Sequence, residues 1–107
     1  MHLQEATQAY LEYLKSLNKS SRTLYTYGKD LGQVQQFFGP ERQLTSILKV
    51  HVGKFYKSPE LLNKPDGTTR APASLKKTIR VFRMFMLWAQ EKGYLEDLPL
   101  TKDTPMG

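Results

Sequence analysis

The 107-residue sequence predicts an all-α protein, a compact bundle of four main helices in one domain. Apolar residues recur at intervals of three and four along most of the chain, and glycine and proline stand where these runs end. The one segment that also alternates as a strand has no partner strand in view. Since a chain of this length buries about two thirds of its unfolded surface, a self-sufficient core is expected.

Two helices are expected in the first forty residues. The first covers residues 3–17, and the second begins at Ser20 or Ser21, which are good N-cap residues, and stops before Gly39-Pro40. Their apolar faces carry Leu3, Ala6, Tyr10, Leu14 and Leu17 in the first helix, and Leu24, Tyr27, Leu31, Val34 and Phe38 in the second. Gly28 and Gly32 interrupt the second pattern. Because each costs ~1 kcal/mol of helix propensity relative to alanine, we interpret them as sites of close packing.

The second half predicts a short helix, a loop and a long helix. Residues 44–57 fit a strand or a helix, and the helices on either side favour a short third helix. Residues 58–72 are rich in turn-forming residues and predict a mobile loop, with Leu61-Leu62 as its apolar anchors. Residues 73–92 form the most regular helix, and Gly93 stands at the C-cap position. Its apolar face carries Leu75, Ile79, Phe82, Met86 and Ala89.

Several classes of protein are excluded or disfavoured. The chain has no cysteine, which rules out disulfides, thiol catalysis and cysteine-based zinc sites. We see neither a signal peptide nor an apolar run near the roughly 18 residues of a membrane span, so we expect a cytoplasmic protein with no membrane partner. His2 is terminal, and His51 stands without an acidic or nucleophilic companion. We therefore expect no cofactor, no metal and no autonomous enzyme.

Positive charge concentrates on the last helix. The formal net charge is +6, the isoelectric point is about 9.6, and both ends of the chain are slightly acidic. At about 100° per residue, Lys76, Arg80 and Arg83 fall within about 60° of each other, flanking one side of the apolar stripe, with Lys77 further round. Residues 73–83 include no acid, whereas a solvated helix face usually mixes signs. Such a stripe suits a phosphate backbone.

The second helix offers a companion surface. Arg22, Tyr25, Lys29, Gln33 and Gln36 share its polar side, and the hydroxyls and free N–H groups at its start suit a phosphate. The complete set predicted to contact DNA is Lys19, Ser20, Ser21, Arg22, Thr23, Tyr25, Lys29, Arg70, Ser74, Lys76, Lys77, Arg80 and Arg83. A helical protein-interaction module, whose basic helix meets an acidic partner, stays open as the alternative.

Two groups of residues carry a resemblance to a known family. They are Ser21-Arg22-Thr23-Leu24, Tyr27, Asp30-Leu31 and Phe37-Phe38, and then Ala73-Ser74-Leu75, Ile79-Arg80, Phe82-Arg83, Phe85, Trp88-Ala89, Gly93-Tyr94-Leu95 and Pro99. In order and spacing they resemble the N-terminal, SAM-like core-binding domain of tyrosine recombinases, the phage-integrase family. The exit segment departs from the family pattern, because Leu98-Pro99 stands where Asn-Pro is usual.

The resemblance implies a function as well as a fold. In that family the core-binding domain is one half of a C-shaped clamp around double-stranded DNA, its second and fourth helices face the duplex, and a separate C-terminal domain cuts the strand. The chain is then expected to bind DNA during integration or recombination, to lack catalysis, and to meet other recombinase protomers only in the full-length protein. Residues 1–100 would form the domain, monomeric in isolation, and residues 101–107 would begin the linker to an absent catalytic domain.

Overall fold

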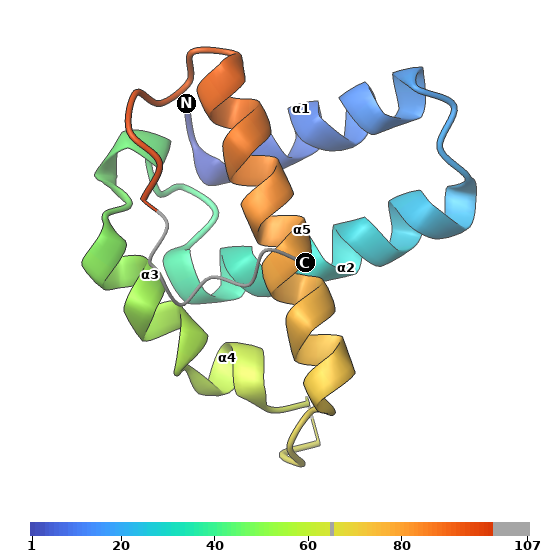
Figure 1. The fold of residues 1–107 in the computed structure, drawn as a ribbon, viewed down its shortest axis with the longest axis vertical. Coiled ribbons are helices and arrows are strands. Elements are labelled where there is room, and N and C mark those ends of the chain that lie inside the picture. Colours follow the sequence, from blue (N-terminus) through green and yellow to red (C-terminus); the bar gives the residue numbers. More distant parts are fainter. Residues whose placement is uncertain (65, 100–107) are drawn as a thin grey trace.

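The computed structural model describes residues 1–64 and 66–99, so the predicted linker over 101–107 lies outside the described residues. In chain order the elements are α1 (Leu3–Ser16), α2 (Ser21–Phe38), the 3-10 turn η1 (Leu44–Ser46), α3 (Lys49–Tyr56), α4 (Pro59–Leu62) and α5 (Pro72–Glu91) (Figure 1). The predicted all-α class is confirmed. One short helix, α4, is added to the four main helices expected.

Local signals explain where the helices begin and end. Ser20 is the N-cap of α2, and its Oγ accepts a hydrogen bond from the N–H of Thr23 at 3.1 Å. Asn18, after α1, has a φ of 62°, and Gly39 and Gly93, after α2 and α5, have φ values of 95° and 82°. Glycine adopts this left-handed region without the steric cost that other residues incur. The long helices therefore lie within about one residue of their predicted bounds.

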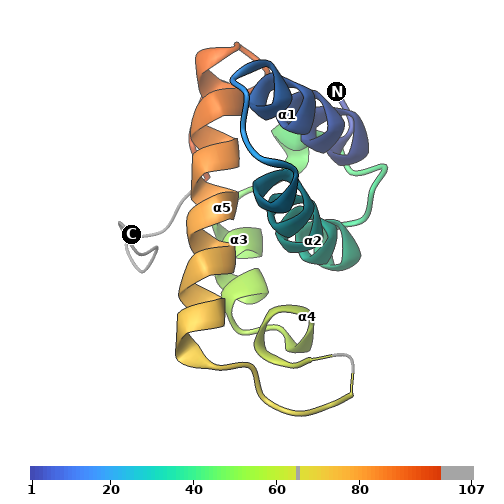
Figure 2. The same ribbon diagram turned by 90° about the vertical axis from the view of Figure 1, so that its right-hand side faces the viewer.

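Helix α5 is the central element of the fold. The antiparallel pair α1 and α2 packs along one side of it, and α3 and α4 lie along another (Figures 1 and 2). Phe82 of α5 is fully buried, with its ring centroid 5.5 Å from that of Phe55 in α3 and 6.1 Å from that of Phe38 in α2. Within the core, these three aromatic rings thus join α2, α3 and α5.

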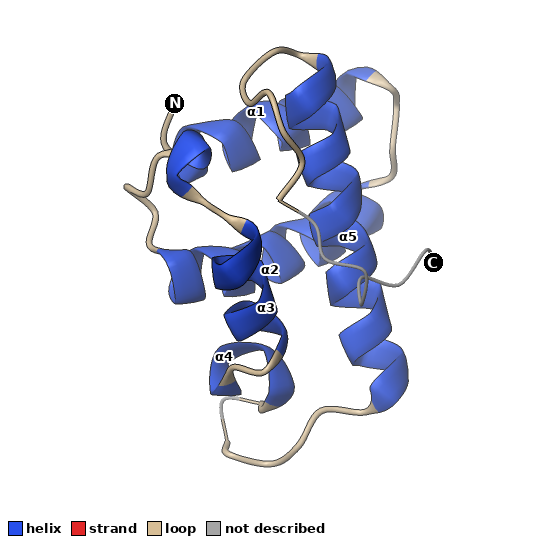
Figure 3. Cartoon of the chain, turned by 60° about the vertical axis from the view of Figure 1, so that its left-hand side comes forward, coloured by secondary structure: helices blue, strands red, loops and turns tan. Residues whose placement is uncertain are grey.

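Secondary structure in the described part of the chain consists of helices and connecting segments (Figure 3). Two isolated backbone bridges, His2 with Gln43 and Asn63 with Thr69, do not extend into strands. Residues 44–57, which also fitted a strand, divide into η1 and α3. The short third helix is confirmed, but it begins later than the periodicity suggested.

The buried face of α5 differs from the predicted stripe. Leu75 and Ile79 are only half-buried, whereas Val81, Phe85 and Trp88 are buried. Trp88 packs its ring 5.2 Å from that of Tyr10 in α1, and burial raises the pKa of the Tyr10 hydroxyl to about 12. Because α1 and α2 cover this additional side of α5, the buried arc is wider than a single helical stripe and is turned toward them.

The sequence predicted one loop over residues 58–72, but the structure has a short helix, α4, within this segment. Ser58 caps α4: its hydroxyl donates to the carbonyl of Phe55 at 2.7 Å and accepts from the N–H of Leu61 at 3.4 Å. Leu61 is fully buried. Further along, Asp66 accepts hydrogen bonds from the hydroxyl and the N–H of Thr68, which lower the pKa of its carboxyl. The predicted mobility of this segment stays a prediction, but Leu61 holds its first part in the core.

The two glycines within α2 are not sites of close packing, contrary to the interpretation from sequence. A Cβ atom added at Gly32 would meet no atom within 4 Å, and one at Gly28 would lie 3.9 Å from Leu11 Cδ1, an ordinary contact. Neither position therefore needs the missing side chain for space.

Gly32→Ala is accordingly expected to stabilise the domain by about 1 kcal/mol, because alanine is the better helix former and the site has room. Urea denaturation measures the change. Gly39→Ala is the matched control: at a φ of 95° a Cβ is strained, and a loss of about 1 to 2 kcal/mol is expected. A loss of stability in Gly32→Ala would show that the site is tighter than described.

Candidate nucleic-acid interface

The exposed side of α5 carries a basic ridge, defined as Lys76, Arg80 and Arg83. Lys76 and Arg80 are exposed and Arg83 is half-buried. At about 100° per residue they lie opposite the buried arc centred near Phe85, rather than flanking the apolar stripe as the sequence had suggested. This follows from the turn of the buried face toward α1 and α2. Lys76 and Arg80 therefore project into solvent, and the ridge extends along roughly two turns of α5.

A second basic group forms where α2 and α5 meet. Arg22 and Lys77, 55 positions apart in sequence, line one surface hollow of about 200 Å³ together with Thr23, Thr26 and Tyr27. We call this the α2–α5 hollow. Arg22 and Lys77 are exposed, while Thr26 and Tyr27 are half-buried. The fold thus brings three predicted DNA contacts, Arg22 and Thr23 of α2 and Lys77 of α5, to one place.

These cations have no carboxylate partner among the residues that the structure describes. Within residues 1–64 and 66–99, the single contact between a basic and an acidic side chain joins His2 Nδ1 and Glu5 Oε1, 2.6 Å apart at the start of α1. That contact also lowers the pKa of the Glu5 carboxyl, first through the hydrogen bond from the His2 N–H. The lysines and arginines of the ridge and the hollow are left with uncompensated charge, and phosphate is the ligand that such a surface attracts.

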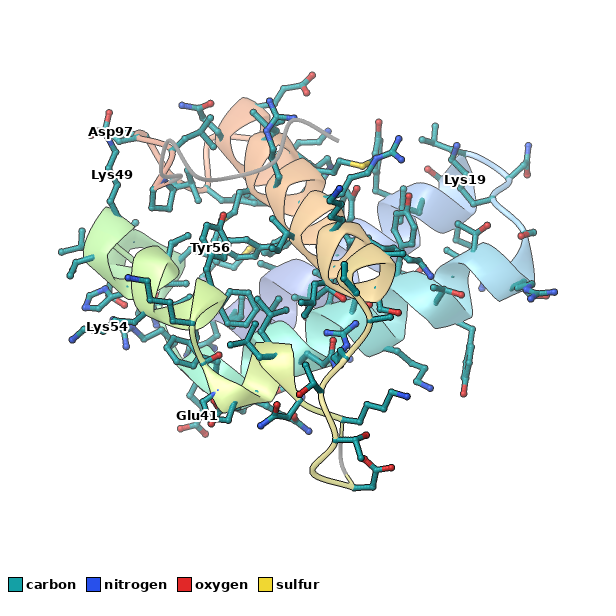
Figure 4. All side chains as sticks on the ribbon, turned by 60° about the horizontal axis from the view of Figure 1, so that its bottom comes forward. Lys19, Glu41, Lys49, Lys54, Tyr56 and Asp97 are labelled. Carbon is teal, nitrogen blue, oxygen red and sulfur yellow. The ribbon has the colours of Figure 1, made fainter. Side chains whose placement is uncertain are left out.

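The start of α2 is already partly occupied by its own cap. The hydroxyl of Ser20 donates to Thr23 Oγ1 at 3.0 Å besides accepting from the Thr23 N–H. Ser21 and Lys19 are exposed, and Figure 4 shows Lys19 at the edge of the molecule, beyond the turn from α1. Ser20 therefore has a structural role in capping. Lys19, Ser21 and Arg22 keep their polar groups toward solvent.

Tyr25 and Lys29 form a pair on the outer face of α2. The Tyr25 side chain is 67% exposed, which is unusual for so large a ring. The Nζ atom of Lys29 lies 5.5 Å from the centre of that ring, within the range of a cation–π contact. Lys29 and Arg22 stand on the same polar side of α2, about two helical turns apart.

Arg70 and Ser74 are placed differently from the other predicted contacts. The guanidinium of Arg70 is half-buried and donates four hydrogen bonds, to Gln33 Oε1, the Leu61 carbonyl, the Ser74 carbonyl and Thr78 Oγ1. Ser74 is exposed, and its backbone carbonyl is one of these acceptors. Arg70 is therefore held within the fold, away from the ridge and engaged at both terminal nitrogens.

Three residues of this region were not in the set predicted from sequence to contact DNA. Thr26 and Tyr27 line the α2–α5 hollow, and the spacing of Thr26 four positions after Arg22 was an available signal. Gln33 was placed on the solvent side of α2, yet it is half-buried and accepts from Arg70 at 3.0 Å. No local pattern could have shown this, because the partner lies 37 positions away.

The described residues offer weaker candidates for a catalytic, metal or ligand site. His51 Nδ1 accepts a hydrogen bond from the N–H of Leu48 at 3.0 Å and lies 3.2 Å from the Arg42 guanidinium, so it caps α3. Among the described residues no group of three or more acidic or histidine side chains is placed to hold a metal ion. A hollow of about 440 Å³ between η1 and residues 93–99 has a mainly apolar lining that includes Leu44, Ile47 and Leu95.

In comparison with known proteins, the chain matches no family model, no curated protein and no solved structure. None of the helices described for this chain is long and apolar enough to cross a membrane.

Proposed function

We propose that this domain binds double-stranded DNA through a surface formed by α2 and α5, and that it serves as one clamp half of a tyrosine recombinase or integrase. The observation that carries the proposal is that Arg22 and Lys77 line the same α2–α5 hollow, beside a basic ridge whose cations have no carboxylate partner in residues 1–64 and 66–99. Charge analysis and the family resemblance select the same two helices independently.

The surface suits a duplex in shape as well as charge. The ridge runs along a helix of 20 residues, about 30 Å long, and its cations are spaced by one turn, so successive side chains can reach successive phosphates. Arginine at positions 80 and 83 can also pair with guanine through two hydrogen bonds in a major groove. Phosphate contacts supply most of the affinity in this proposal, and sequence preference is slight.

Lys77→Gln tests the proposal at the hollow. Because log K changes by about 0.9 per tenfold change in salt for each neutralised phosphate, one lost contact costs about eightfold at about 0.1 M salt. We expect this loss in fluorescence anisotropy with a short labelled duplex. Lys54→Gln is the matched control, because it removes the same charge at a distant position. Lys54 lies on α3, on the opposite edge of the molecule from Lys19 (Figure 4).

The control variant should bind within about twofold of the parent, since a distant exposed charge acts only through screened long-range attraction. Equal losses in both variants would indicate attraction to net charge without a defined surface. Indifference of the parent to duplex, together with binding to an acidic protein segment, would favour the protein-interaction module instead.

A further inference from the structure

We propose that Arg70 is a positioning residue, which acts through Thr78 and Asp30 to hold α5 against α2 and so fixes Lys77 relative to Arg22. The inference rests on the proposed function, because the surface that it positions is the one proposed to bind DNA. It replaces the direct DNA contact predicted for Arg70 from sequence.

The three side chains form a relay between the two helices. Thr78 on α5 is fully buried, and Asp30 on α2 is 7% exposed. The Thr78 hydroxyl lies 2.7 Å from an Arg70 terminal nitrogen and 2.9 Å from Asp30 Oδ1. The guanidinium and the carboxylate thus share one hydroxyl group between them, and no direct ion pair is needed.

The chemistry of the hydroxyl fixes the direction of the relay. Thr78 has one proton to give, and its nearby acceptors are the Asp30 carboxylate at 2.9 Å, the Ser74 carbonyl at 3.2 Å and Gln33 Oε1 at 3.5 Å. The carboxylate is both the nearest acceptor and the only one that bears a charge, so it takes the proton. The lone pairs of the hydroxyl then accept from Arg70. Charge at Arg70 therefore compensates the buried charge of Asp30 through a neutral group.

The relay stands next to the α2–α5 hollow on both helices. Lys77 is adjacent to Thr78, and Thr26 and Tyr27 stand one helical turn before Asp30. Asp30 Oδ2 is buried with no hydrogen-bond partner among the described residues, so Oδ1 is its one anchor to α5. If that hydrogen bond is lost, the buried carboxylate has to be hydrated by water that enters between the helices. The contact between α2 and α5, which places Lys77 beside Arg22, then has to shift.

Two conservative variants separate positioning from contact. Arg70→Lys keeps the charge but cannot make four hydrogen bonds from a planar guanidinium, whereas a phosphate contact tolerates this substitution. Thr78→Val keeps the shape and removes the hydroxyl. We expect Arg70→Lys and Thr78→Val each to weaken duplex binding by up to about eightfold at about 0.1 M salt. This is the loss expected when the phosphate contact of Lys77 is removed. In a Lys77→Gln background, neither variant should weaken binding further.

Solution NMR without DNA provides the second readout. Amide shifts of residues 22–27 and 77 are expected to move in both variants, at a temperature where circular dichroism shows full folding. A third variant, Arg70→Gln, tests for a direct phosphate contact. If Arg70→Lys binds duplex like the parent while Arg70→Gln lowers the magnitude of the slope of log K against log salt by about 0.9, Arg70 is a phosphate contact and the inference is wrong. If Arg70→Lys and Thr78→Val lower only the melting temperature, and leave duplex binding and the amide shifts unchanged, the relay has only a stabilising role and the inference is also wrong.

The two readouts also separate this inference from the proposed function. If the parent does not bind duplex, the proposed function fails, yet the NMR shifts still decide whether the relay arranges the hollow. Unmoved shifts in both variants would overturn the inference whatever the domain binds.

Discussion

Replacing both Lys76 and Arg80 with glutamate is expected to abolish duplex binding while leaving the helical fold intact. Two phosphate contacts are worth about 60-fold together at about 0.1 M salt, and the new carboxylates add repulsion. From a parent dissociation constant of about 10⁻⁵ M, within the non-specific range, binding would fall below detection. Both side chains are exposed on the side of α5 opposite Phe85, so the core is not disturbed.

The matched control is Lys49→Glu with Lys54→Glu on α3. It changes the net charge by the same amount, and both lysines are exposed on a helix away from the ridge (Figure 4). We expect this variant to keep most of the parent's affinity. Anisotropy for binding and circular dichroism for folding measure both pairs. Duplex binding by the Lys76→Glu, Arg80→Glu variant at parental strength would show that the ridge is not the DNA surface.

Phe82→Ala is expected to produce the largest loss of stability, about 3 to 5 kcal/mol. The ring has no exposed surface and meets Phe38 and Phe55, so truncation removes apolar burial and leaves a cavity among groups from three helices. A domain of this size has a free energy of unfolding of about 5 to 15 kcal/mol, so the substitution removes a large part of the stability.

Leu87→Ala is the control for the core truncation. It lies on the same helix, and its side chain is 36% exposed on the solvent side. A change within about 1 kcal/mol is expected in chemical denaturation. If Phe82→Ala cost no more than Leu87→Ala, the aromatic cluster would not be the centre of the fold.

The long helices could be predicted because their signals are local. Ser20, Gly39 and Gly93 mark ends that the structure reproduces, and apolar spacing locates most of each buried face. Helix α4 was missed although a signal existed, since Ser58, Pro59 and Glu60 form an N-cap, a first-turn proline and a first-turn acid. With only Leu61 and Leu62 as apolar residues, the segment was too short to show a period.

Tertiary context decided the rest. The face of α5 that carries Val81 and Trp88 is buried because α1 and α2 cover it, and the helix's own spacing does not contain that information. Arg70 looked like one more exposed cation, but its acceptors come from α2, α4 and α5. Charge composition located the basic helices, whereas only the fold shows that Lys77 meets Arg22 and that Arg70 turns inward.

Salt dependence of duplex binding by the parent domain tests the central proposal most directly. If about five of the cations on α2 and α5 neutralise phosphates, log K plotted against log salt falls with a slope of about −4 to −5, with little difference between duplex sequences. Lys77→Gln should lower the magnitude of that slope by about 0.9, and Lys54→Gln should leave it unchanged. A slope near zero, or no duplex binding at low salt, would contradict the proposal that α2 and α5 form a DNA-binding surface.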